Sequence, residues 1–113
     1  MEDAARRLAQ IKLVHTAVWA VIAGCIVALF PSIAFDHRAL FAALHVPIVA
    51  EIVVLAAFRG TCPLTHVAAR YTDDRSPDFD IFLPRLLARW NKEVFTVLLV
   101  VAWSWAAWRW LTV

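Results

Sequence analysis

The residues best suited to chemistry in this sequence are a glutamate and two histidines that interrupt long apolar stretches. His15 lies in the first stretch, and His45 and Glu51 lie in the second. A charged side chain near the centre of a bilayer costs several kcal/mol, so ionisable residues there tend to mark a function or a partner. Because the two stretches are expected to be antiparallel, we expect His15 and Glu51 to lie about one helical turn apart in depth and to share a hydrogen bond.

Pro47 adds to this polar set within the second stretch. Proline removes a backbone donor, bends its helix and frees a carbonyl group one turn earlier. His45 stands beside the expected bend, and the same depth matching places it level with Cys25. We expect the polar side chains to join the helices to one another, with a proton relay or a cofactor site as the alternative.

Haem is the cofactor that these histidines could hold, because an iron can be held between two imidazoles. After the hairpin is folded, however, His15 and His45 differ in depth by about ten residues, or roughly 15 Å. This offset argues against a shared iron. It leaves open ligation by one histidine alone, or by His15 together with His66.

The remaining candidate sites are weaker. Cys62 and His66 could share a helix face, but a zinc site normally takes three or four ligands. The aspartate-rich segment 71–80 lacks the central glycine and final glutamate of a calcium loop, so we expect an exposed turn. Neither a phosphate-binding glycine loop nor a recognisable Ser/His/Asp motif is present. The sequence therefore predicts no metal site and no catalytic residues, and we expect a protein that is not an enzyme.

Three apolar stretches must position these residues, and we predict membrane spans at 13–35, 39–58 and 93–111. A helix of roughly 20 apolar residues crosses a hydrocarbon core and satisfies its own backbone hydrogen bonds there. The composition agrees, with 63% hydrophobic residues, 18% charged residues and a mean hydropathy of +0.71. The prediction is an all-α, integral membrane three-helix bundle that forms a single transmembrane domain over residues 1–113.

The distribution of charge predicts the orientation of this bundle. Most basic residues lie before the first span or in the 59–92 loop. Cytoplasmic segments next to membrane helices are enriched in Lys and Arg, so the amino terminus should be cytoplasmic and the carboxyl terminus periplasmic. We thus expect a multi-pass protein of a bacterial inner membrane. The basic residues form no stripe with stacking aromatic residues, which argues against nucleic acid as a partner.

Residues 82–92 separate by helical period into an apolar side and a basic side. This pattern predicts a short amphipathic helix in the membrane surface before the third span, with its basic side against anionic lipid headgroups. Tryptophans near the end of the third span should anchor it at the other interface. The predicted anchors are Arg85, Arg89, Trp90, Lys92, Trp103, Trp105, Trp108 and Trp110.

Small residues recur at every fourth position in two of the spans. Ala20, Gly24 and Ala28 form such a stripe in the first span, and Ala102 and Ala106 form a shorter one in the third. Small residues allow helix backbones to approach closely in lipid. We expect both stripes to pack within the bundle, with docking onto a neighbouring protein as the alternative.

The polar residues of the first two spans are followed by a Cys-Pro-Leu-Thr motif at Cys62, Pro63, Leu64 and Thr65. Together they resemble a family of small bacterial integral membrane proteins classified as a domain of unknown function. The most specific element is Cys-Pro-Leu-Thr after the second span, and the resemblance covers nearly the whole chain. It implies the topology and a shared polar array, without an activity. The residues that carry it are His15, His45, Pro47, Glu51, Cys62, Pro63, Leu64 and Thr65, with Phe82, Leu83 and Pro84 before the last span.

Two classes of function follow from these observations. Three helices bury little surface against one another, and six tryptophans offer large contact areas, so a small noncatalytic subunit of a larger membrane protein complex is favoured. Such a subunit would stabilise or help to assemble a complex, which could be respiratory or photosynthetic. The alternative is a haem-binding, redox or proton-handling protein that uses the intramembrane His, Glu and Cys residues.

Overall fold

The computed structural model describes residues 2–112 of the chain. Over this range the protein is all-helical, with helices α1 (Glu2–Ala34), α2 (Arg38–Ala57), α3 (Pro63–Ala68) and α4 (Arg85–Leu111). Three of them, α1, α2 and α4, are long and apolar enough to cross a membrane. The prediction of an all-α protein with three potential spans is confirmed.

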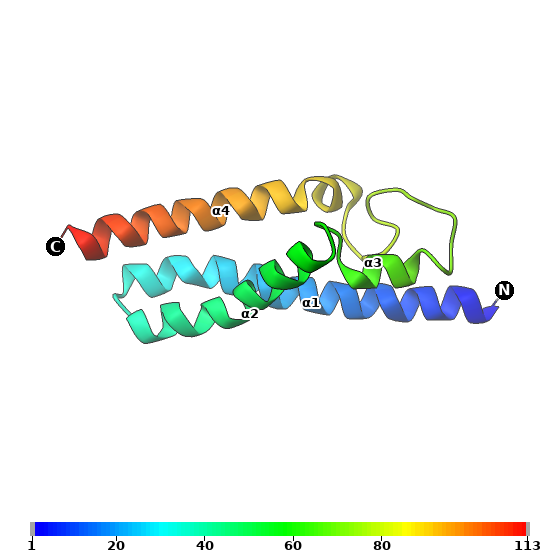
Figure 1. The fold of residues 1–113 in the computed structure, drawn as a ribbon, viewed down its shortest axis with the longest axis horizontal. Helices are drawn as coiled ribbons and strands as arrows, with labels where there is room; N and C mark the ends of the chain where they lie inside the picture. The colour runs from blue at the N-terminus through cyan, green and yellow to red at the C-terminus, as the bar shows by residue number, and fades with distance from the viewer. Residues whose placement is uncertain (1, 113) are drawn as a thin grey trace.

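The long helix α1 lies between the other elements and contacts α2, α3 and α4 (Figure 1). α2 turns back along the second half of α1, whereas α4 runs in the same direction as α1. The short helix α3 and the loop that follows it lie along the first half of α1. The molecule is consequently elongated, with dimensions of 60 × 25 × 22 Å.

Helices α1 and α2 end with the same backbone geometry. The residue after the capping residue has a positive φ of 57° in both helices, at Asp36 and at Arg59. The backbone N–H of the following residue then donates to a carbonyl group in the last turn of the helix. In α2, Gly60 donates to the carbonyl of Leu55 at 2.6 Å. This Schellman arrangement satisfies carbonyl groups that the end of a helix would otherwise leave free.

Two of the helices extend beyond the predicted spans. α1 begins at Glu2, and its 33 residues measure about 50 Å at 1.5 Å per residue. α4 begins at Arg85, so residues 85–92 form its first two turns. The prediction of a separate helix in the membrane surface is therefore wrong, because the amphipathic segment continues directly into the third span. α2 continues through Pro47 and keeps the predicted length.

The core of the protein follows one stripe of α1. Buried apolar residues from the three long helices meet there: Ile26, Leu29, Ile33, Ile48, Leu99, Ala102 and Ala106. Ala102 and Ala106 thus lie at a contact between helices.

The stripe of small residues on α1 lies elsewhere. Ala20 and Gly24 are exposed and Ala28 is half-buried, and no atom of another element lies within 4 Å of the position that a Cβ would take on Gly24. The prediction that this stripe packs within the bundle is therefore wrong for Ala20 and Gly24. α1 instead turns the bulkier stripe of Ile26, Leu29 and Ile33 toward its neighbours.

Candidate functional site

A polar cluster joins α1 and α3 to the loop that leads into α4. His15 Nδ1 lies 3.1 Å from the backbone carbonyl oxygen of Asp80 and 3.5 Å from the Asp80 carboxylate. Because a carbonyl oxygen can only accept, Nδ1 carries the proton and donates. The Thr65 hydroxyl donates to the same carboxylate, which is buried. Asp80 therefore receives hydrogen bonds from two helices and holds the loop against α1.

Cys62 lies beside the His15 imidazole. It is the residue that precedes Pro63 at the start of α3, and its free thiol is half-buried. We refer to His15, Cys62, Thr65 and Asp80 as the loop-anchoring cluster. It brings an imidazole, a thiol, a hydroxyl and a carboxylate together, but nowhere in residues 2–112 are three or more His, Cys, Asp or Glu placed to hold a metal ion.

The cluster corrects two predictions from the sequence. His15 pairs with Asp80, so the predicted hydrogen bond to Glu51 is wrong. Asp80 itself was expected in an exposed turn, whereas only 5% of its surface is exposed. The signal that could have indicated its burial is the apolar residue Ile81 directly after it, which is also buried.

Two further hydrogen bonds continue the contact along α1. The hydroxyl of Thr16 accepts from the backbone N–H of Phe82 at 2.9 Å. One turn later, the indole N–H of Trp19 donates to Asn91 Oδ1 on α4 at 2.6 Å. Sequence reasoning missed these residues because neutral polar side chains at single positions carry no pattern. Together with Asp80 they set the height at which α4 begins beside α1.

His45 belongs to a second polar contact, between α2 and α4. Its Nδ1 lies 2.7 Å from the carbonyl oxygen of Phe41, and the indole N–H of Trp103 donates to its Nε2 at 2.8 Å. The first bond requires a proton on Nδ1 and the second requires none on Nε2, so both exist only with a neutral imidazole. The partner of His45 is therefore Trp103 rather than Cys25, which packs against the apolar core.

This arrangement does not fit haem ligation by His45, since both ring nitrogens are already engaged. His66 is exposed, with its ring 6.3 Å from that of Phe58. Of the two histidines predicted as haem ligands, only His15 has a ring nitrogen, Nε2, that takes no part in these bonds to Asp80, Phe41 and Trp103.

The tryptophans of α4 mostly bind other helices. Trp110 donates to Asp36 Oδ1 at 2.6 Å, and the Arg38 guanidinium lies 5.2 Å from its ring. Trp105 packs against Phe30 with 6.2 Å between ring centroids. Of the four tryptophans predicted to anchor the end of the third span, only Trp108 is largely exposed, at 65% of its surface.

The basic residues at the start of α4 also have partners within the chain. Arg85 lies 3.6 Å from the Asp78 carboxylate, and the Lys92 ammonium donates to the carbonyl of Gly60. Arg89 lies over the ring of Trp90 at 5.3 Å. The two ends of the 59–84 connection are therefore tied to α4 by these side chains.

Within this connection, the segment around Asp74 is held by its own hydrogen bonds. The backbone N–H of Ser76 donates to Asp74 Oδ1 at 2.9 Å, which lowers the pKa of this exposed carboxyl below its ordinary value of 3.8. Arg75 donates to the carbonyl groups of Thr72 and Ala69 at 2.7 and 3.2 Å. These bonds are local, and they order the turn without contacting the long helices.

The fold and its polar contacts define a small all-helical protein with three helices able to span a membrane and a loop tied back onto the first of them. No protein-family model matches this chain, and neither does any curated protein or solved structure. The resemblance carried by the Cys-Pro-Leu-Thr motif therefore stays a prediction.

Proposed function

We propose that this chain is a small noncatalytic subunit of a larger membrane protein complex, which it stabilises or helps to assemble. In this proposal the amino terminus and the 59–92 loop face the cytoplasm of a bacterial inner membrane, because they hold most of the basic residues. A respiratory or photosynthetic complex is the first candidate for the partner.

Glu51 is the observation that carries this proposal. It lies about six residues, or roughly 9 Å, from the end of α2, on a helix able to span a membrane. Its side chain is half-buried, and it forms no ion pair or hydrogen bond within the described part of the chain. An ionisable residue within a membrane helix is costly, by up to about 2.5–3.5 kcal/mol at the helix centre. A hydrogen-bond donor on a partner helix would reduce this cost, whereas lipid chains cannot.

The exposure of α2 supports the same proposal. Only 6% of its most apolar segment is buried, compared with 17% for each of the other two long helices. α2 lies along α1 and meets α4 through His45 and Trp103, while large apolar side chains such as Val46 and Val53 remain exposed on it (Figure 1). The exposed small residues Ala20 and Gly24 on α1 offer another place where a foreign helix could approach closely.

Extraction of the native membrane in mild detergent, followed by size separation and mass spectrometry, tests the proposal. The wild-type chain should migrate with a large complex. Glu51→Leu removes the hydrogen-bonding group and should release the chain, whereas Glu51→Gln should release only part of it. Val53→Leu is the matched control, because Val53 is 60% exposed on the same helix. Migration of the wild-type chain alone would refute the proposal.

The loop-anchoring cluster favours a second candidate, a redox, haem-binding or proton-handling protein. Histidine exchanges protons near neutral pH, and here His15 lies beside a buried carboxylate and a thiol. A visible absorption spectrum of the same size-separated fraction tests the haem version. A Soret band from a small particle that disappears in His15→Ala would favour this candidate over the subunit.

A further inference from the structure

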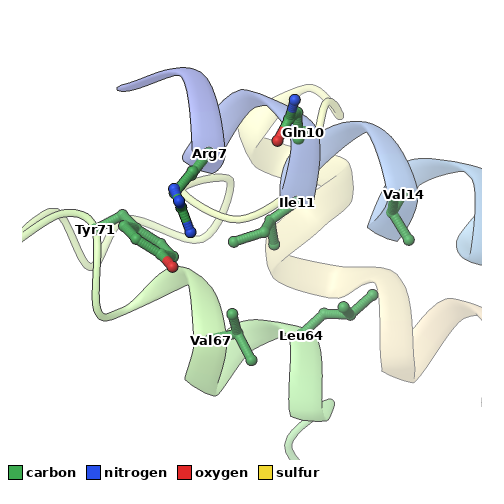
Figure 2. A pocket seen from close by; sticks show the side chains of 7 residues that line it. All are labelled: Arg7, Gln10, Ile11, Val14, Leu64, Val67 and Tyr71. Atoms are coloured by element: carbon green, nitrogen blue, oxygen red, sulfur yellow. The ribbon is translucent and has the colours of Figure 1, made fainter. Parts of the chain in front are cut away.

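A groove between α1 and α3 combines an apolar floor with a cation at one end (Figure 2). Its volume is about 280 Å³. The apolar lining residues are Ile11, Val14, Leu64 and Val67, and the polar ones are Arg7, Gln10 and Tyr71. The Arg7 side chain extends into the groove near the ring of Tyr71, above Val67 (Figure 2).

The lengths of the helices place this groove at the membrane surface. The 20 residues of α2 measure about 30 Å, which is the thickness of a hydrocarbon core. Since α2 runs antiparallel to α1, its end at Ala57 lies level with about His15. Val14 is then at the edge of the hydrocarbon, and Arg7 is about 10 Å further out.

At this depth the groove crosses the headgroup layer, which is roughly 5–7 Å thick on each side of a bilayer. In an undisturbed bilayer, Ile11 and Val67 would face polar headgroups rather than acyl chains. An acyl chain drawn up into the groove would cover them. The volume is just below the range of about 300–1,000 Å³ that is typical of ligand pockets, which suits part of one chain but not a whole lipid or a haem.

The charge of the groove indicates what such a chain would carry. Arg7 is exposed and forms no ion pair within residues 2–112. A guanidinium binds a phosphate group through two parallel N–H donors. Arg6 lies next to Arg7 on α1, and Arg70 follows α3. Both add positive charge, which favours a lipid with a net negative headgroup.

We propose that this groove binds one acyl chain of an anionic phospholipid, with the lipid phosphate at Arg7. The chain enters from the hydrocarbon between Val14 and Leu64, and it lies against Ile11 and Val67. The side chains of Gln10 and Tyr71 stand beside the headgroup as further hydrogen-bond donors. This site is separate from Glu51, and it requires no protein partner.

Native mass spectrometry of the isolated chain from nanodiscs tests the proposal. The nanodiscs contain phosphatidylcholine and phosphatidylglycerol in equal parts, and the measured quantity is the fraction of protein that keeps each lipid. The wild-type chain should keep phosphatidylglycerol in preference. Arg7→Gln should reduce this retention about fivefold, the worth of one basic residue at an anionic surface. Arg6→Gln removes the same charge outside the groove and should have a clearly smaller effect.

A second pair of variants tests the apolar part of the groove. Val14→Phe fills it and should abolish the retained lipid, whereas Val21→Phe adds the same ring at an exposed position of the same helix. Circular dichroism shows whether each variant keeps its helices, and only folded variants are compared.

Three results would overturn the proposal. The first is that the wild-type chain keeps the two phospholipids equally and that Arg7→Gln does not change this retention. The second is replacement of the phospholipid by free oleate added to the nanodiscs, which would make a fatty acid the occupant. The third is that the wild-type chain forms a dimer and that Val14→Phe converts it to a monomer. This would make a second copy of the chain the occupant of the groove.

Discussion

Replacement of Asp80 by alanine should detach the loop before α4 from α1 and α3. The variant leaves the Thr65 hydroxyl without its acceptor and removes the carboxylate 3.5 Å from His15 Nδ1. Its backbone carbonyl can still accept from His15. A buried polar group without a partner costs about 1–3 kcal/mol. Because the half-buried Thr65 hydroxyl loses its acceptor and His15 loses the carboxylate beside it, we expect the free energy of unfolding to fall by about 1–3 kcal/mol.

Thermal and chemical unfolding in detergent micelles measures this decrease. Asp80→Asn keeps an acceptor for Thr65 and should cost only about 1 kcal/mol. Asp73→Ala is the matched control, because Asp73 is exposed and should change stability by less than about 0.5 kcal/mol. The rate of Cys62 modification by a thiol reagent adds a local measurement. It should rise in Asp80→Ala, because Cys62 lies in the same cluster.

A double-mutant cycle separates the Asp80–Thr65 hydrogen bond from other effects of the substitution. Thr65→Val and Asp80→Ala should show a coupling energy of about 1–2 kcal/mol, since each removes the other's partner. Additive effects of the two substitutions, or equal stability of Asp80→Ala and Asp73→Ala, would refute the cluster as described.

Three further predictions follow from the polar contacts and the backbone geometry. Trp103→Phe removes the N–H that binds His45 and should lower thermal stability in detergent by about 1 kcal/mol, with Trp108→Phe as the exposed control. Gly60→Ala should destabilise the protein by about 1–2 kcal/mol in the same assay, because Gly60 has a φ of 84°; unchanged stability would contradict this backbone argument. The bond to Asp74 lowers the pKa of that carboxyl, so it stabilises the turn above pH 3.8 and is lost as the pH falls through the lowered pKa. Amide exchange of Ser76 should therefore become faster relative to other turn amides in acid, and Asp74→Asn should lack this change.

Much of the fold was predictable because length and hydropathy are properties of the sequence itself. The apolar residues of α2 predict a helix within one residue of its observed ends. The ends of α1 and α4 were harder to predict, because charged residues such as Arg6 and Arg89 are compatible with a helix that continues beyond the membrane or with a break. For α3 the sequence indicated only that Cys62 and His66 could share a helix face, since six residues are too few for a periodic pattern.

The candidate site was predicted only in part. His15 and the Cys62–Thr65 motif were identified from residue type, and the structure brings them together. Their common partner, Asp80, was not identified, because it is one of several aspartates in a polar segment. Its burial depends on a contact with His15, which is 65 residues away in the sequence.

The sequence by itself determined that this protein has three helices able to span a membrane, since a long uncharged apolar run has few other stable forms where water is absent. Only the tertiary structure decided which side of each helix faces the others. In a soluble protein the polar side of a helix indicates solvent, but every side of α1 beyond His15 is largely apolar, and lipid is as apolar as leucine. The choice between the stripe of Ala20, Gly24 and Ala28 and the stripe of Ile26, Leu29 and Ile33 therefore rests on the fit of side chains between neighbouring helices, which no pattern along the chain records.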